Sequence, residues 1–145
     1  MNRETYESEL EKRGSFVYTN SGVSMYPLIR REGDLIVIKK IDGDLKKYDV
    51  PLFRRNTGEY VLHRIVKVKD GKYDIRGDNC IYSEKGIEKS AVIGVLDAVV
   101  RGGKEIKMET PGQKAYARLW CAIYYPRALF MRLKQIINRI LKVKK

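Results

Sequence analysis

The sequence predicts a mainly β (α+β) protein: an antiparallel β domain with a short N-terminal helix before it and basic amphipathic C-terminal helices after it. Short runs rich in β-branched and aromatic residues, separated by turn residues, fill residues 15–100. After residue 112 the apolar residues recur largely at intervals of three and four, which is helical periodicity. We therefore expect one compact domain over residues 1–109 and a helical tail over residues 110–145.

The N-terminal helix is predicted from its end signals. Thr5 can cap a helix that runs to about Arg13, and Glu7 and Glu9 fall in its first turn, where the helix dipole favours acids. Gly14 is a typical stop residue.

The predicted strands are short and follow one another closely. They are SFVYT (15–19), DLIVIKKI (34–41), VPLFRR (50–55), EYVLHRIVKVK (59–69), KYDIRG (72–77) and AVIGVLDAVV (91–100). Asp70-Gly71 between two of them favours a tight type I′ hairpin. The order and spacing indicate a mostly antiparallel sheet.

The tail carries most of the excess charge. The net charge is +12, and residues 110–145 hold nine Lys or Arg and no acid. Pro126 cannot lie inside a continuous helix without loss of a backbone hydrogen bond, so we expect a break near Tyr125 and a second helix opened by Pro126.

Several classes of protein are disfavoured by what the sequence lacks. Cys80 and Cys121 are far apart and show no metal-ligand spacing, so we expect free thiols, no metal and no organic cofactor. No signal peptide and no apolar run long enough to cross a bilayer is evident. The expected location is the cytoplasm, or the periphery of the cytoplasmic membrane.

Two residues suggest nucleophilic chemistry. Ser24, in the turn-like stretch SGVSMYP, has no evident capping or solubility role, and a serine hydroxyl becomes a nucleophile only if a base takes its proton. The chain's one histidine, His63, is predicted on a strand face with Val61 and Ile65, with Leu62 and Arg64 on the other. A half-buried neutral imidazole can act as that base, although a lone histidine can also be purely structural.

A third group could hold the imidazole in the required tautomer. Asp78, in the stretch DIRGDNC, follows a predicted strand and precedes a polar loop. Alone, the Gly77-Asp78-Asn79 stretch is simply a turn.

In combination, these segments resemble the signal peptidase and LexA-type serine peptidases. The stretches SGVSMYP, REGDLIVI, DVPLFRR, YVLHRIVKV, YDIRGDN and AVIGVLDAVV occur in the family's order over roughly residues 14–103. The resemblance implies Ser24 as nucleophile, Gly33-Asp34 as scaffold and His63 as base before Arg64. It is closest to the histidine branch, which includes the endoplasmic-reticulum type of signal peptidase I. It also implies Asp78 as the imidazole's partner and Ser83 as a supporting serine.

The sequence departs from the family around the oxyanion hole. Signal peptidases usually read Ser-Gly-Ser-Met, whereas Gly22 stands two residues before the nucleophile here and Ser21 one place further back. We therefore assign the oxyanion hole mainly to backbone N–H groups, including that of Ser24. Met25 would help to shape a shallow substrate pocket. The chain shows neither the usual membrane anchor before the nucleophile nor the DNA-binding domain of a LexA-like repressor.

The function that follows is that of a serine endopeptidase that cleaves an extended peptide, such as a signal or leader sequence of a pre-protein. One alternative is a non-catalytic adaptor that keeps the fold and holds a membrane or a polyanion through its basic tail. Another is a self-cleaving regulator, although no Ala-Gly pair precedes Ser24.

Two arrangements of the tail remain open. Residues 112–145 are compatible with a helix in an anionic membrane interface and with a helix that packs its apolar stripe on the β domain. Nucleic acid is a less favoured partner, because no recognised binding motif accompanies the charge.

Overall fold

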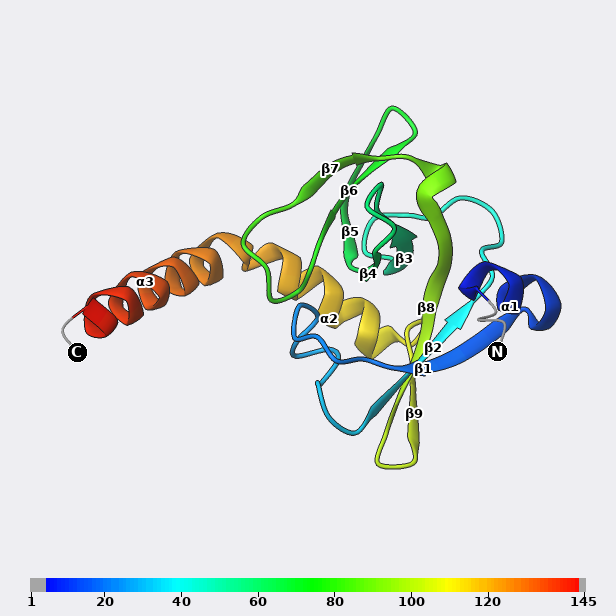
Figure 1. Cartoon of the computed structure of the whole chain (residues 1–145), viewed down its shortest axis with the longest axis horizontal. Coiled ribbons are helices and arrows are strands. Elements are labelled where there is room, and N and C mark those ends of the chain that lie inside the picture. Colours follow the sequence, from blue (N-terminus) through cyan, green and yellow to red (C-terminus); the bar gives the residue numbers. More distant parts are fainter. Residues whose placement is uncertain (1–4, 144–145) are drawn as a thin grey trace.

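The predicted fold class is confirmed by the computed structural model, which describes residues 5–143 (Figure 1). Its strands are β1 (Ser15–Thr19), β2 (Asp34–Lys39), β3 (Pro51–Arg54), β4 (Tyr60–Leu62), β5 (Arg64–Lys69), β6 (Lys72–Arg76), β7 (Glu84–Ile87), β8 (Val92–Arg101) and β9 (Lys104–Lys107). Its helices are α1 (Tyr6–Arg13), the 3₁₀ turn η1 (Lys89–Ala91), α2 (Pro111–Ala122) and α3 (Tyr124–Val143). The strands β7 and β9 were not expected from the sequence.

The first helix has the predicted ends. The Thr5 side chain accepts a hydrogen bond from the Ser8 backbone N–H, and Gly14 takes a left-handed conformation at φ 77°. The helix buries only Leu10, which joins the core of the large sheet. The Tyr6 ring also stacks on Phe16 of β1, with the ring centroids 4.8 Å apart, so two side chains of α1 hold it beside the sheet.

The larger sheet is antiparallel, and among residues 5–143 its strands β1 and β4 each leave one edge unpaired. Its strand order is β1-β2-β8-β3-β4. The strand β9 pairs with residues 98–101 of β8, past the residues of β8 that pair with β3. Within the described residues β1 pairs only with β2, and β4 pairs only with β3. The sheet curls into a half-barrel, so that these two edges border one cavity.

The smaller sheet, in the order β5-β6-β7, confirms the predicted hairpin. Asp70 and Gly71 connect β5 to β6, and both have positive φ values, 52° and 70°. Two positive φ values in a two-residue connection are the signature of a type I′ turn.

The long strand predicted over residues 59–69 is divided at His63, which corrects the expected alternation. β4 ends at Leu62 in the large sheet, and β5 begins at Arg64 in the small one. Val61 and Ile65 do pack in one apolar cluster, as predicted, but Arg64 is buried as well. The chain passes from one sheet to the other at His63, and strict alternation therefore ends there.

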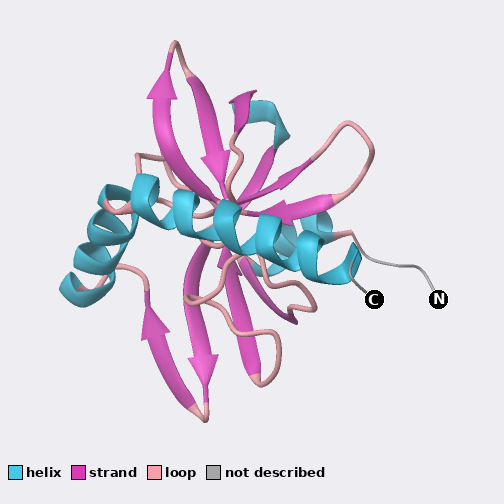
Figure 2. Cartoon of the chain, turned by 90° about the vertical axis from the view of Figure 1, so that its left-hand side faces the viewer, coloured by secondary structure: helices cyan, strands magenta, loops and turns pink. Residues whose placement is uncertain are grey.

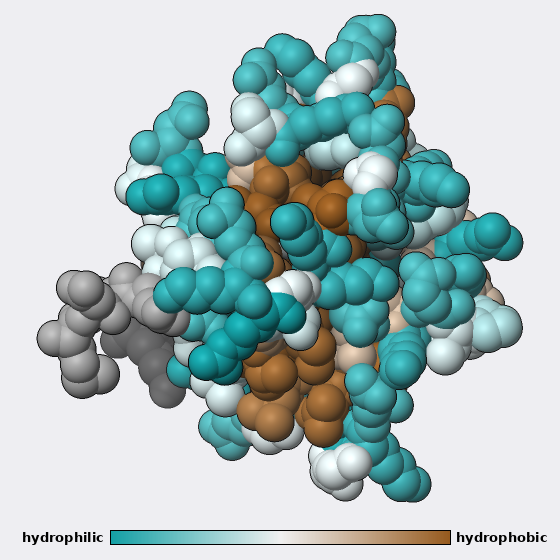
Figure 3. All heavy atoms as spheres, turned by 90° about the vertical axis from the view of Figure 1, so that its right-hand side faces the viewer, coloured by the Kyte–Doolittle hydropathy of each residue, from teal (hydrophilic) through white to brown (hydrophobic). Residues whose placement is uncertain are grey.

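Two apolar clusters fill the interior. The larger one joins the inner side of the large sheet to α1 and to the turn after Ser24, which contributes Met25, Leu28 and Ile29. The smaller one lies between the sheets around Phe53 and Ile65. Some apolar side chains also reach the surface on the side that carries α1 and β1 (Figure 3), where Val17 is 58% exposed.

The break between the C-terminal helices falls slightly earlier than predicted. It lies at Ile123, and Pro126 occupies the first turn of α3 rather than its first position. In Figure 1, α3 extends away from the sheets, and in Figure 2 it runs in front of them. No helix among residues 5–143 combines the length and the apolar character needed to cross a membrane.

Candidate active site

Ser24 lies in a tight turn after β1 that is anchored by its apolar neighbours. Met25 is 2% exposed and Ile29 is fully buried, and the Ile29 N–H donates to the Met25 carbonyl. Ser24 itself is partly exposed. The burial of Met25, Leu28 and Ile29 thus anchors the turn, while Ser24 lines the cavity.

The loop after β6 holds this turn through its backbone. The Asn79 N–H donates to the Ser24 carbonyl at 2.8 Å, and the Asn79 side-chain amide donates to the Val23 carbonyl at 3.2 Å. The Asp78 N–H contacts the Met25 sulfur at 3.5 Å. The loop of residues 77–80, called the GDN loop below, therefore holds residues 24–29, called the serine turn, in place.

His63 is oriented with its two ring nitrogens toward different groups. A Cβ added to Gly77 would lie 3.1 Å from His63 Nε2 and 2.6 Å from the Ser24 carbonyl oxygen, so Nε2 and the serine turn border the same small space. No hydrogen bond joins Ser24 Oγ to His63 within the described residues. Such contacts are often long in a free enzyme and shorten when substrate is bound.

The other ring nitrogen faces a carboxylate that the sequence did not suggest. His63 Nδ1 lies 3.7 Å from Glu84 Oε1 and is buried without a hydrogen-bond partner. Glu84 is itself held by Arg55, which donates to both of its carboxylate oxygens at 3.0 and 2.5 Å. These hydrogen bonds lower the pKa of Glu84 and keep it charged.

Burial is the largest influence on the pKa of the His63 imidazole. It lowers the pKa of His63 below its ordinary value, because the protonated ring would lose its hydration, while the Glu84 charge opposes this shift. The neutral form, which is the one that can accept a proton, therefore prevails at neutral pH.

In the part of the chain that the structure describes, Asp78 forms no hydrogen bond with the imidazole, in contrast to the prediction. Both of its carboxylate oxygens accept hydrogen bonds from Arg64, each at 2.8 Å, and the Tyr116 hydroxyl donates to one of them at 3.0 Å. The Asp78 and Arg64 side chains are 2% and 4% exposed. The chain changes sheets at His63, and it is therefore the side chain of Arg64 that binds the Asp78 carboxylate. The charge of Asp78 raises the pKa of His63, but less than the charge of Glu84 does.

The C-terminal helices also hold this loop. Trp120 Nε1 and Arg127 Nη1 each donate to the Asp78 carbonyl oxygen at 2.9 Å, and the Tyr124 hydroxyl donates to the Ile81 carbonyl. The Arg127 guanidinium also stacks 3.9 Å from the Trp120 ring centre. The junction of α2 and α3 is thus part of the support of the candidate site.

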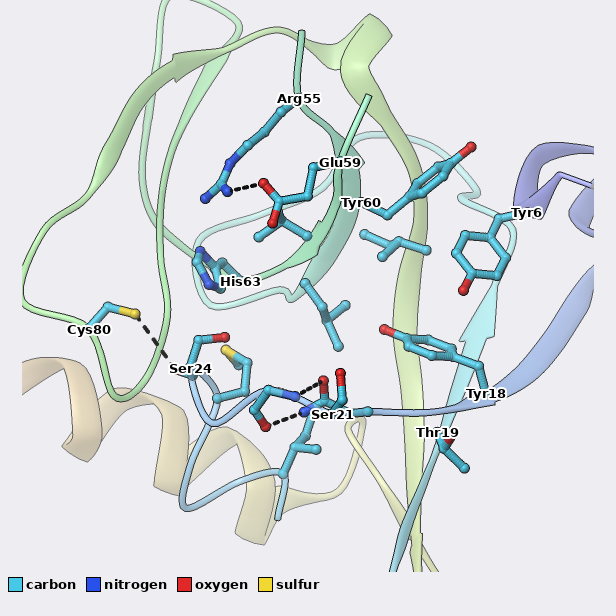
Figure 4. A pocket seen from close by; sticks show the side chains of 17 residues that line it. Tyr6, Tyr18, Thr19, Ser21, Ser24, Arg55, Glu59, Tyr60, His63 and Cys80 are labelled. Atoms are coloured by element: carbon cyan, nitrogen blue, oxygen red, sulfur yellow. Dashed lines mark hydrogen bonds and ion pairs between the residues drawn. The ribbon is translucent and has the colours of Figure 1, made fainter. Parts of the chain in front are cut away.

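Ser24 and His63 line one cavity of about 490 Å³ (Figure 4). One wall comes from the end of β1 and the residues after it, Tyr18 to Gly22, and the other from residues 59–63, which include β4. Tyr6 packs between the two walls, with its ring 4.8 Å from that of Tyr60 and 5.7 Å from that of Tyr18. The cavity therefore lies in the gap between the open edges of β1 and β4.

The other predicted site residues differ in their placement. Ser21, Gly22 and Met25 line the cavity, whereas Ser83 is not among its lining residues. The Gly22 N–H already donates to the Asn20 side chain at 3.0 Å. The Ser24 N–H makes no hydrogen bond within residues 5–143, which leaves it available as an oxyanion donor.

Several residues of the site could not be identified from the sequence. Arg55 directly follows β3 and Glu84 begins β7, so the two meet only in the folded chain. Cys80 lines the cavity beside Ser24 as a free thiol.

We expect Gly77→Ala to reduce both stability and cleavage. The new Cβ would lie 2.6 Å from the Ser24 carbonyl and from Cys80 Sγ, so the loop and the serine turn must separate. Overpacking of this kind costs about 1–3 kcal/mol. Chemical denaturation and peptide cleavage measure the two effects. Gly112→Ala, whose Cβ would meet open space, serves as the control. Unchanged cleavage in Gly77→Ala would show that the close contact is not needed.

Comparison with known proteins gives one match. The family model described as Peptidase S24-like matches residues 2–97, about two thirds of the chain, including Ser24, His63 and the GDN loop. Comparisons with curated proteins and with solved structures give no match. Since the match spans more than half of the sequence and the fold agrees with it, the chain belongs to the Peptidase S24-like family.

Proposed function

We propose that this protein is a serine endopeptidase in which Ser24 is the nucleophile and His63 the general base. The observation that carries the proposal is the placement of Ser24 and His63 Nε2 around one small space, in a cavity between two unpaired strand edges. The family supports a peptidase-type fold, and the activity itself is our inference.

The substrate is proposed to bind as an added strand. β1 and β4 each leave one edge unpaired within the described residues, and the cavity walls continue from these edges. An extended peptide placed between them would hydrogen-bond to both, as in other cases of strand addition. Signal and leader peptides are the proposed class, as the resemblance to the histidine branch of signal peptidases implies.

The chemistry uses two steps. The Ser24 hydroxyl attacks the scissile carbonyl and its proton passes to His63 Nε2, while the Ser24 N–H stabilises the oxyanion. The peptide C–N bond then breaks, and the leaving amine takes that proton. Water, deprotonated by His63, hydrolyses the resulting ester and frees the Ser24 hydroxyl.

Glu84 is proposed as the positioning residue for His63. If Nε2 accepts the serine proton, the ring proton must sit on Nδ1, which is the atom beside Glu84. The Glu84 carboxylate would favour this tautomer and stabilise the imidazolium that forms. Arg55 keeps the carboxylate charged and in place.

Labelling with a serine-directed acylating probe tests the activity. We expect one acyl group per chain, located on Ser24 by mass spectrometry, and no labelling of Ser24→Ala. Absence of labelling in the parent protein, together with absence of peptide cleavage, would favour the non-catalytic adaptor.

We expect the pH profile to identify the base and its partner. Because burial lowers the pKa of His63, kcat/KM should rise with pH to a plateau, with a midpoint below about 6.5. Glu84→Gln removes the charge that opposes this shift, so the midpoint should move to lower pH. The plateau should fall by roughly 10- to 100-fold, less than the roughly 10⁴-fold loss typical of a hydrogen-bonded triad aspartate.

Glu59→Gln is the matched control for this prediction. Glu59 also binds Arg55, at 2.6 Å, but its side chain is 62% exposed. The control should shift the midpoint less than Glu84→Gln. Equal shifts in the two variants would mean that Glu84 has no special relation to the imidazole.

A further inference from the structure

The helix α3 leaves its apolar face without a partner in the described chain. Phe130 is 68% exposed, and its apolar neighbours on the same face are about half exposed or more. The face consists of Leu129, Phe130, Leu133, Ile136, Ile137 and Ile140. At about 100° per residue these positions form one continuous stripe along the helix.

The side of α3 that packs against the rest of the protein is the side opposite the apolar stripe. Ala128 is buried, and Tyr124 and Met131 are partly buried, whereas residues 132–143 are all exposed. On a helical projection these three residues lie across from Leu133. The packing arrangement, in which the apolar stripe covers the β domain, is therefore not the one that α3 adopts, although α2 does pack on the protein through Tyr116 and Ala117.

Basic side chains border the apolar face on both sides. Arg132 and Arg139 lie along one edge and Lys134 along the other, each about one quarter to one third of a turn from Leu133. No acid occurs among residues 110–145. The helix thus combines a wide apolar stripe with an unbalanced positive charge, which is typical of helices that lie in a membrane interface.

We propose that α3 docks on an anionic lipid membrane, with its apolar stripe among the upper acyl chains and its basic side chains at the headgroups. Charge complementarity selects this occupant over a second copy of the chain. Two α3 helices face to face would bring many positive charges together, with no acid on either helix to pair with them. Anionic headgroups satisfy both the charge and the apolar face.

Co-sedimentation with lipid vesicles tests the proposal on the whole protein. We expect binding to vesicles of phosphatidylcholine mixed with phosphatidylglycerol. Binding to pure phosphatidylcholine vesicles, or in high salt, should be at least about tenfold weaker, because part of the attraction is screened Coulomb energy. Ser24→Ala should bind as well as the parent, which separates this test from the test of the peptidase.

Two sets of substitutions separate the apolar and the electrostatic contributions. Leu133→Gln with Ile137→Gln interrupts the stripe at constant charge and should abolish binding. Lys134→Gln, Arg139→Gln and Lys142→Gln together remove three exposed charges and should lower the partition coefficient by on the order of 100-fold. The control removes three exposed lysines elsewhere, Lys67, Lys69 and Lys104, and should have a much smaller effect.

Three outcomes would overturn the proposal. The first is equal binding to neutral and anionic vesicles, or no binding to either. The second is an equal loss in the control variant, which would indicate net charge rather than α3. The third is a parent protein that is dimeric in analytical ultracentrifugation and becomes monomeric on Leu133→Gln with Ile137→Gln, which would assign the stripe to self-association.

Discussion

Ser24→Ala is expected to lower kcat for peptide cleavage by about 10⁴-fold or more, because the alanine side chain cannot form the acyl intermediate. The fold should not change. Within the described residues the hydrogen bonds of Ser24 use its carbonyl oxygen, which accepts from Asn79, and this contact persists in the variant. Cleavage of a fluorogenic peptide and thermal unfolding measure the two properties.

The control for this variant is Ser90→Ala, which removes an exposed hydroxyl in η1. It should retain full activity and stability. A purified Ser24→Ala protein that still cleaves at near the parent rate would exclude the serine mechanism and direct attention to the Cys80 thiol in the same cavity.

Asp78→Asn is expected to destabilise the protein by about 3–5 kcal/mol, since it leaves the Arg64 guanidinium buried without its carboxylate. Urea denaturation measures this loss. Cleavage should also fall, because the Asp78 carboxylate anchors the loop that holds the serine turn through its hydrogen bonds with Arg64 and Tyr116. The midpoint of the pH profile should move less than in Glu84→Gln, since the charge of Asp78 acts more weakly on His63.

Asp34→Asn is the matched control for Asp78→Asn. Asp34 forms a similar bidentate pair with Arg101, but the Arg101 side chain is 28% exposed and the pair is not among the residues that line the cavity. Its loss of stability should be smaller and its pH profile unchanged. If Asp78→Asn instead kept its stability and shifted the midpoint as much as Glu84→Gln, Asp78 would be the imidazole's partner after all.

Local signals made much of the fold predictable. The ends of α1 depend on Thr5 and Gly14, and the β5–β6 turn depends on Asp70-Gly71, so neighbouring residues alone decide these structures. The succession of most strands along the chain followed from the alternation of apolar runs and turns. Ser24 and His63 were found because each lies in a characteristic stretch, and the cavity they share agrees with that prediction without testing their roles.

The contacts of the acids could not be predicted in the same way. His63 and Arg64 are adjacent, and strand periodicity cannot tell which of them faces Asp78 when the chain changes sheets between them. The proximity of Glu84 to His63 depends on how β7 pairs with β6 and on the hydrogen bonds from Arg55. Both are long-range consequences of packing, and no local pattern encodes them.

The edges of β1 and β4 that stay unpaired within the described residues limit what the proposed enzyme can recognise. A peptide that fills the gap between β1 and β4 must offer its own N–H and C=O groups, so helical or folded segments are excluded whatever their sequence. Every second side chain of the added strand would point away from the cavity and be free to vary. Proline would be tolerated only where its missing N–H faces no acceptor. Substrate specificity would therefore depend first on an extended peptide conformation and second on a few alternate side chains.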